Sequence, residues 1–169
     1  MIKRTVTLVI VTALTAWPAA FAQRAVLDDS LSPRQAYTLD LAWQSQDIAA
    51  ALHAMLGNDD EALPPLRGYL PDVEILLDTR GHTGQRARVY LSLPATIIGE
   101  AGGTLELSWK GRGDFRSGSV RPGQQALVFE GEIERPVLQG VFDFTVALQV
   151  GAAASSFTFE PVYEIEVLD

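Results

Sequence analysis

Apolar and polar side chains alternate along most of the last 103 residues of the chain, 67–169. Within 142–149, every second side chain is large and apolar, while aspartate, threonine, alanine and glutamine fill the positions between. Successive side chains of a β-strand point to opposite faces of a sheet, so this pattern is typical of antiparallel strands with one solvated face. The alternation recurs over 73–77, 87–93, 105–109, 127–133, 142–148 and 157–167.

Six or seven such strands, with turn residues between them, predict two packed sheets. The sequence therefore predicts a mainly β fold: an antiparallel immunoglobulin-like β-sandwich domain over 67–169, preceded by an N-terminal α-helical segment. Trp109 continues the alternation of Leu105 and Leu107 and is expected in the core. Pro161 lacks the N–H that a ladder needs, so the last strand is expected at an edge or with a bulge.

The first 22 residues have the pattern of a secretory signal peptide. Lys3 and Arg4 precede an apolar run over 5–16, and Ala20-Phe21-Ala22 supplies small residues for cleavage. The apolar run is too short to span a bilayer, which takes about 20 residues. We therefore expect cleavage after Ala22 and a periplasmic or secreted mature protein.

The mature chain is expected to be acidic and to have no membrane span. Removal of two cations takes the net charge from −8 to −10, which disfavours binding to nucleic acid phosphates. The chain has no cysteine, and this fits a bacterial periplasm better than a disulfide-stapled extracellular domain.

Residues 23–66 are expected to form the N-terminal helical segment and a proline-rich connector. Ser32 can cap a helix over 33–56, with Pro33 at its first position and Gln35 closing a capping box. One face of this helix would carry the apolar side chains Tyr37, Leu41, Ile48, Leu52 and Met55. Tyr37, Leu39, Leu41 and Trp43 also alternate as a strand does, in which case only 46–56 is helical, with Ser45 as its cap.

Glutamates are expected to line the outer faces of two strands, Glu130, Glu132 and Glu134 on one and Glu160, Glu164 and Glu166 on the other. The inward face of the first strand would then carry Leu127, Phe129 and Ile133. If the two strands are neighbours, arginines must lie between these carboxylates to offset their repulsion. Arg86, Arg88, Arg116, Arg121 and Arg135 are available for this role.

The motif search assigns no catalytic residue, no metal ligand and no cofactor. The chain contains neither G-x-x-x-x-G-K nor G-x-S-x-G, and its two histidines, His53 and His82, lack metal-binding spacing. The tripeptide Arg112-Gly113-Asp114 resembles an integrin-binding sequence, but a glycine-rich turn is the favoured interpretation.

The leading hypothesis is an exported, non-enzymatic interaction or accessory module of a bacterial envelope assembly, whose partner is another envelope protein. Leu39 and Trp43 would lie outside the apolar stripe of a helix over 33–56, so they are the candidate partner-binding residues. The alternative is a carbohydrate- or small-ligand-binding sandwich with a groove lined by Tyr69, Tyr90 or Trp43. A hydrolase that uses His53 or His82 ranks last.

The signal sequence predicts the mass of the mature protein. Exported material should begin at Gln23, because Ala20 and Ala22 are the small residues that signal peptidase requires. Intact-mass spectrometry of the exported fraction checks this, and a species that retains Lys3 and Arg4 would contradict it.

Overall fold

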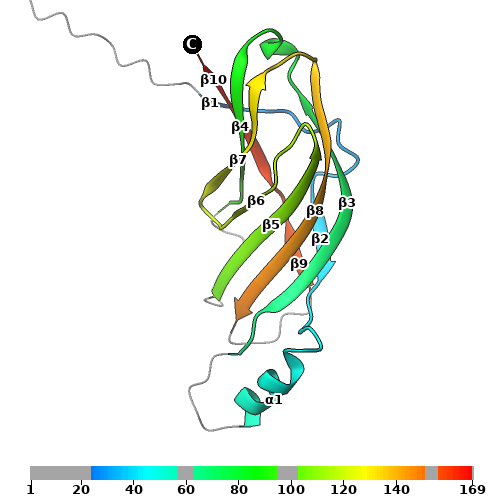
Figure 1. Cartoon of the computed structure of the whole chain (residues 1–169), viewed down its shortest axis with the longest axis vertical. Helices are drawn as coiled ribbons and strands as arrows, with labels where there is room; N and C mark the ends of the chain where they lie inside the picture. The colour runs from blue at the N-terminus through cyan, green and yellow to red at the C-terminus, as the bar shows by residue number, and fades with distance from the viewer. Residues whose placement is uncertain (1–23, 57–62, 95–102, 151–155, 169) are drawn as a thin grey trace, which may run out of the picture.

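The computed structural model describes residues 24–56, 63–94, 103–150 and 156–168. These residues form a mainly β fold in which antiparallel sheets pack together, with one short α-helix at one end of the molecule (Figure 1). The predicted signal peptide lies outside the described residues. The elements are β1 (Arg24–Val26), β2 (Tyr37–Asp40), α1 (Ile48–Leu56), β3 (Leu66–Asp78), the 3-10 helix η1 (Arg80–His82), β4 (Arg86–Ser92), β5 (Gly103–Gly113), β6 (Gly118–Val120), β7 (Gln125–Glu132), β8 (Val137–Val150), β9 (Ser156–Phe159) and β10 (Val162–Leu168).

Two four-stranded sheets form the layers. One has the strand order β1-β10-β4-β7 and the other the order β3-β8-β5-β6, and a third, two-stranded sheet pairs β2 with β9. All of these pairings are antiparallel. The predicted antiparallel sheets are thus confirmed, whereas this strand order does not establish an immunoglobulin-like topology.

Aromatic side chains fill the space between the layers. Phe144 on β8 is fully buried, and its ring centroid lies 5.3 Å from that of Phe159 and 5.4 Å from that of Phe142. Both contacts are edge-to-face, an arrangement that aromatic rings favour. Trp109 is 3% exposed, as the alternation of β5 predicted, and its indole N–H donates to the Arg116 carbonyl at 2.9 Å.

The alternation on β7 was assigned to the wrong face. Val128 is fully buried, whereas Leu127 and Phe129 are half-buried. Val89 pairs with Phe129 and Tyr90 with Leu127, so Val128 is an extra residue of β7, and this bulge breaks the two-residue period of β7. Ile133, just beyond β7, is buried as expected.

Pro161 separates two strands that belong to different sheets. β9 ends at Phe159 and pairs with β2, while β10 begins at Val162 and lies between β1 and β4. The prediction of an edge strand is wrong for β10, which has neighbours on both sides. The missing N–H of Pro161 falls where the chain leaves one ladder and enters the next, so no ladder bond is lost there.

The predicted helix over 33–56 is also wrong, and the alternative with a strand around Tyr37 is correct. Tyr37 and Leu39 are buried on one face of β2, and its register with β9 pairs Tyr37 with Phe159. Ser32 does not cap a helix. Its hydroxyl accepts a hydrogen bond from Leu76 N at 2.9 Å and donates one to Leu76 O at 3.2 Å.

Residues 28–42 of the N-terminal segment run along the edge of β3 and close that side of the sandwich, and we call this junction the seam. Asp78 N donates to Asp28 O near one end of the seam, and Ala42 and Arg67 exchange two backbone hydrogen bonds near the other. β2 approaches β3 so closely that a Cβ at position 68 would lie 2.3 Å from Leu39 Cδ1, which explains why this position is Gly68. On the opposite side, Arg116 N donates to Val128 O on β7. Both sides of the sandwich are therefore bridged between layers, which limits exposed strand edges.

Truncating the central aromatic ring should strongly destabilise the fold. We expect Phe144→Ala to lower the free energy of unfolding by roughly 3–5 kcal/mol, through lost transfer energy and a residual cavity. Thr145→Ala, on the outer face of the same strand, is the control and should cost far less. Urea denaturation measures both, and equal midpoints would contradict this placement of Phe144.

Candidate functional site

The helix α1 exposes its large apolar side chains and buries Ala51. Ala51 is 1% exposed, and Asp47 and Ala54, four and three residues away on the same helical face, are half-buried. Ile48 and Leu52 are 47% and 52% exposed. The helix thus rests on the side of Ala51 and Ala54. Of the apolar stripe predicted for a longer helix, Ile48, Leu52 and Met55 face outward, whereas Tyr37 and Leu41 are buried.

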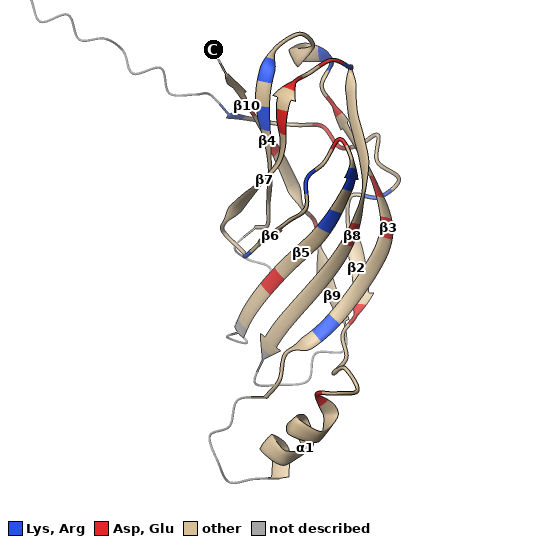
Figure 2. Ribbon diagram, in the orientation of Figure 1, with Lys and Arg blue, Asp and Glu red and all other residues tan. Residues whose placement is uncertain are grey.

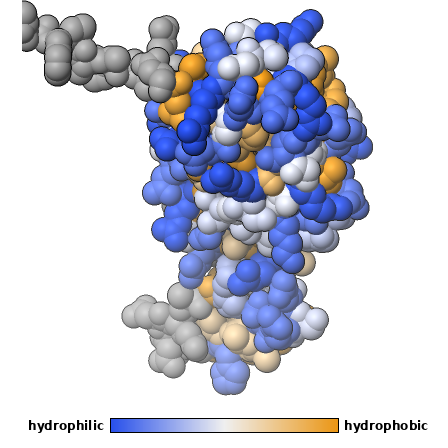
Figure 3. Space-filling view, turned by 45° about the horizontal axis from the view of Figure 1, so that its top comes forward, coloured by the Kyte–Doolittle hydropathy of each residue, from blue (hydrophilic) through white to orange (hydrophobic). Residues whose placement is uncertain are grey.

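We call the exposed set the α1 stripe. It consists of Ile48, Leu52, Met55 and Leu56. Met55 is 53% and Leu56 85% exposed. Figure 3 shows pale hydrophobic colouring beside hydrophilic residues at the lower end of the molecule, where α1 lies. Large apolar side chains grouped in this way mark interaction sites more often than singly exposed ones do.

The stripe carries no formal charge. The segment Ile48–Leu56 contains no aspartate, glutamate, lysine or arginine, so α1 is uniformly tan in Figure 2. Asp47 lies just before the helix, and His53 lies on its exposed side. Within the described residues, no helix has the length and apolar character needed to cross a membrane.

Leu39 and Trp43 do not form the exposed face on which their assignment to a partner rested. Leu39 is 5% exposed and belongs to the core. Trp43 is partly buried against that core, and its indole N–H donates to Pro64 O at 3.0 Å. The physical reason is that β2 has a two-residue period, so Leu39 shares a face with Tyr37 and Leu41.

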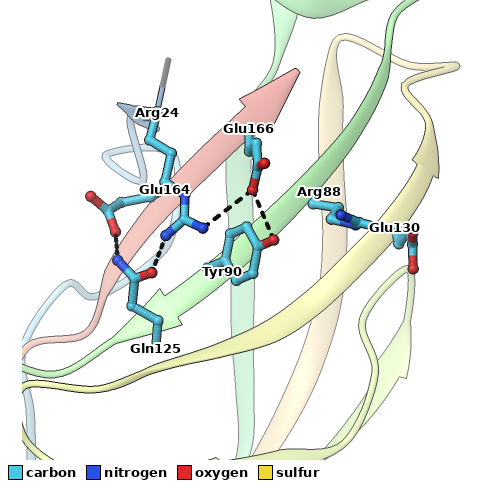
Figure 4. A network of polar contacts seen from close by, with 7 residues as sticks. All are labelled: Arg24, Arg88, Tyr90, Gln125, Glu130, Glu164 and Glu166. Atoms are coloured by element: carbon cyan, nitrogen blue, oxygen red, sulfur yellow. Dashed lines mark hydrogen bonds and ion pairs between the residues drawn. The ribbon is translucent and has the colours of Figure 1, made fainter. Parts of the chain in front are cut away.

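The aromatic residues suggested for a sugar-binding groove lie apart. Tyr69 is 62% exposed on β3, whereas Tyr90 lies on β4 in the other layer. Figure 4 shows Tyr90 within a polar network, where Arg24 lies 4.3 Å above its ring and its hydroxyl donates to Glu166 at 2.9 Å. Trp43 packs beside the connector at Pro64. These three side chains do not line one groove.

The strands that carry the two sets of glutamates, β7 and β10, are not neighbours in the sheet, and an arginine of the strand between them pairs with a glutamate. β4 lies between β7 and β10, and Arg88 on β4 donates twice to Glu130 Oε1, at 3.0 Å and 2.9 Å. This hydrogen-bonded ion pair lowers the pKa of Glu130. On the other side of β4, burial and the hydrogen bond to Glu166 raise the pKa of Tyr90. The carboxylates of Glu130 and Glu166 already have partners within the sheet (Figure 4).

The remaining sequence candidates are likewise dispersed. His53 lies on α1, while His82 ends η1, beyond the opposite end of β3, and its Nδ1 contacts Gln85 Oε1. Arg112 pairs with Asp72 and Asp143, so the Arg-Gly-Asp sequence does not present a free arginine. Among the described residues, no three histidine, aspartate or glutamate side chains gather as a metal site would require.

Comparisons of the chain with family models, with curated proteins and with solved structures find no match.

The burial of Trp43 predicts a stability effect. Trp43→Ala should remove part of the core packing and the hydrogen bond to Pro64 O, at a cost of about 2 kcal/mol. For a domain of this size we expect the thermal midpoint to fall by roughly 4–8 °C. Tyr69→Ala is the matched control, because Tyr69 is exposed, and calorimetry on both variants distinguishes them. Equal midpoints would contradict a packing role for Trp43.

Proposed function

We propose that the protein is an exported, non-enzymatic interaction module of a bacterial envelope assembly. In this proposal, an immunoglobulin-like sandwich serves as the scaffold that presents α1 at one end. The α1 stripe docks into an apolar groove of another envelope protein, and basic side chains rim that groove. The observation that carries the proposal is the outward orientation of Ile48, Leu52, Met55 and Leu56.

The small size of α1 supports docking. A helix of nine residues is shorter than the 12–15 that an isolated helix needs in water, and its stability must come from packing. Of its residues, Ala51 alone is buried, so its own domain supplies little of that packing. Burial of the stripe by a partner would add the missing contacts, as amphipathic helices do in hydrophobic grooves.

Charge determines the kind of partner. The chain has a net charge of −8, and the residue before the helix is Asp47. A basic rim would attract the acidic protein, while the uncharged stripe enters the apolar centre of the groove. A second copy of the chain would be repelled because it is acidic as well. An anionic membrane would repel the acidic chain for the same reason. A basic-rimmed protein groove therefore fits better than either.

Site-specific photo-crosslinking in cells tests this proposal. Leu52→benzoylphenylalanine places the photoreactive group in the stripe, and Ala50→benzoylphenylalanine places it on another exposed face of the same helix. We expect an adduct from position 52 and none from position 50. The adduct should disappear when Met55→Lys is added, because a buried cation would lose its hydration.

Mass spectrometry of the adduct then identifies what covers the stripe. A peptide from an apolar groove with lysine or arginine at its rim supports the proposal. An adduct with a second copy of this chain or with lipid would overturn it, and so would equal adducts from positions 50 and 52 or none from either.

A further inference from the structure

The seam between the N-terminal segment and β3 opens in its middle. Ser32 bridges to Leu76 on one side of the opening, and Ala42 bridges to Arg67 on the other. Between these ties lies a cleft of about 360 Å³. Its walls include Pro33, Arg34, Tyr37, Pro71, Asp72 and Glu74.

The β3 wall of this cleft is not built to accept another strand. Pro71 has no N–H to donate, and Asp72 N already donates to Asp143 Oδ1 at 2.9 Å. Asp72 has a φ of 55°, a left-handed conformation that is uncommon outside glycine, and the register with β8 shifts between Leu70 and Val73. A bulge with a proline protects an edge strand from pairing. A compact ligand therefore suits the cleft better than an extended chain.

The two walls carry opposite charges. Arg34 lies on the N-terminal wall and Glu74 on the β3 wall, and both are exposed. Neither forms an ion pair with another residue of the described parts of the chain. Asp72, by contrast, is held by Arg112, whose Nη2 lies 2.7 Å from its carboxylate.

The cleft also has a fixed, uncharged base. Tyr37 is 4% exposed, and its hydroxyl donates to Arg34 O at 2.6 Å, which ties the turn that bears Arg34 to the core. Burial, followed by the nearby charge of Asp29, raises the pKa of Tyr37 to about 12, so it stays neutral. Pro33 and Pro71 add rigid apolar surface beside it.

We propose that this seam cleft binds a small zwitterion of dipeptide size. Its carboxylate pairs with Arg34, its ammonium group pairs with Glu74, and its apolar side chain packs on Pro33, Pro71 and Tyr37. A volume of 360 Å³ equals that of about twelve water molecules at ~30 Å³ each, which suits a ligand of one or two residues. This site is separate from the α1 stripe and does not depend on the function proposed for it.

Titration of the uniformly ¹⁵N-labelled protein with alanyl-leucine tests the inference. We expect saturable amide shifts in 34–37 and 70–74, with a Kd of about 1 mM, because the exposed charges are only partly desolvated. N-acetyl-alanyl-leucine and alanyl-leucine amide each lack one charge and should bind roughly two- to fivefold more weakly, as expected for the loss of one exposed ion pair.

Two variants test which charged group of the dipeptide pairs with Arg34 and which with Glu74. Arg34→Gln should weaken binding of the free dipeptide and remove its advantage over the amide, whereas Glu74→Gln should remove its advantage over the acetylated form. Arg67→Gln, an exposed arginine on β3 outside the cleft, is the control and should change neither. Shifts that do not saturate, or equal binding of the free and blocked dipeptides, would overturn the inference. So would unchanged discrimination in the variants.

Discussion

The packing around Phe144 joins parts of the chain that are remote in sequence. Its ring centroid lies 6.0 Å from that of Tyr37 on β2, 6.5 Å from that of Trp109 on β5 and 5.3 Å from that of Phe159 on β9. Strands from the beginning, middle and end of the chain thus meet at one side chain. Burial of such large rings supplies the stabilisation that the ordering of three distant segments requires.

The alternation of apolar and polar residues predicted the antiparallel sheets because it indicates which face of each strand is buried. It placed Trp109 and Phe144 in the core, where the structure has them. It failed around Tyr37–Trp43, where apolar residues satisfy both a helical and a two-residue period. The decisive factor there is pairing with β9, more than a hundred residues away, and local periodicity does not contain that information.

The candidate sites depended even more on long-range geometry. The sequence indicated a helix that ends near Met55, but whether Leu52 faces the sandwich or solvent depends on how α1 meets its domain. The seam cleft combines residues near Arg34 with residues near Glu74, and these come together only because the N-terminal segment lies along β3. Pro71 and Asp72 form a bulge inside a strand of thirteen residues, a feature that the alternation of the sequence does not indicate.

Pairing between the two ends of the described chain has a kinetic consequence. β1 pairs with β10, where Arg24 lies opposite Glu166, and β2 pairs with β9. A polypeptide is made from its N-terminus, so β1 and β2 exist long before their partner strands do. Contacts of such large sequence separation close late and slow the folding of a domain. Until β9 and β10 have emerged, β4 lacks a neighbour on one side, and the nascent chain carries an unpaired strand edge that invites aggregation.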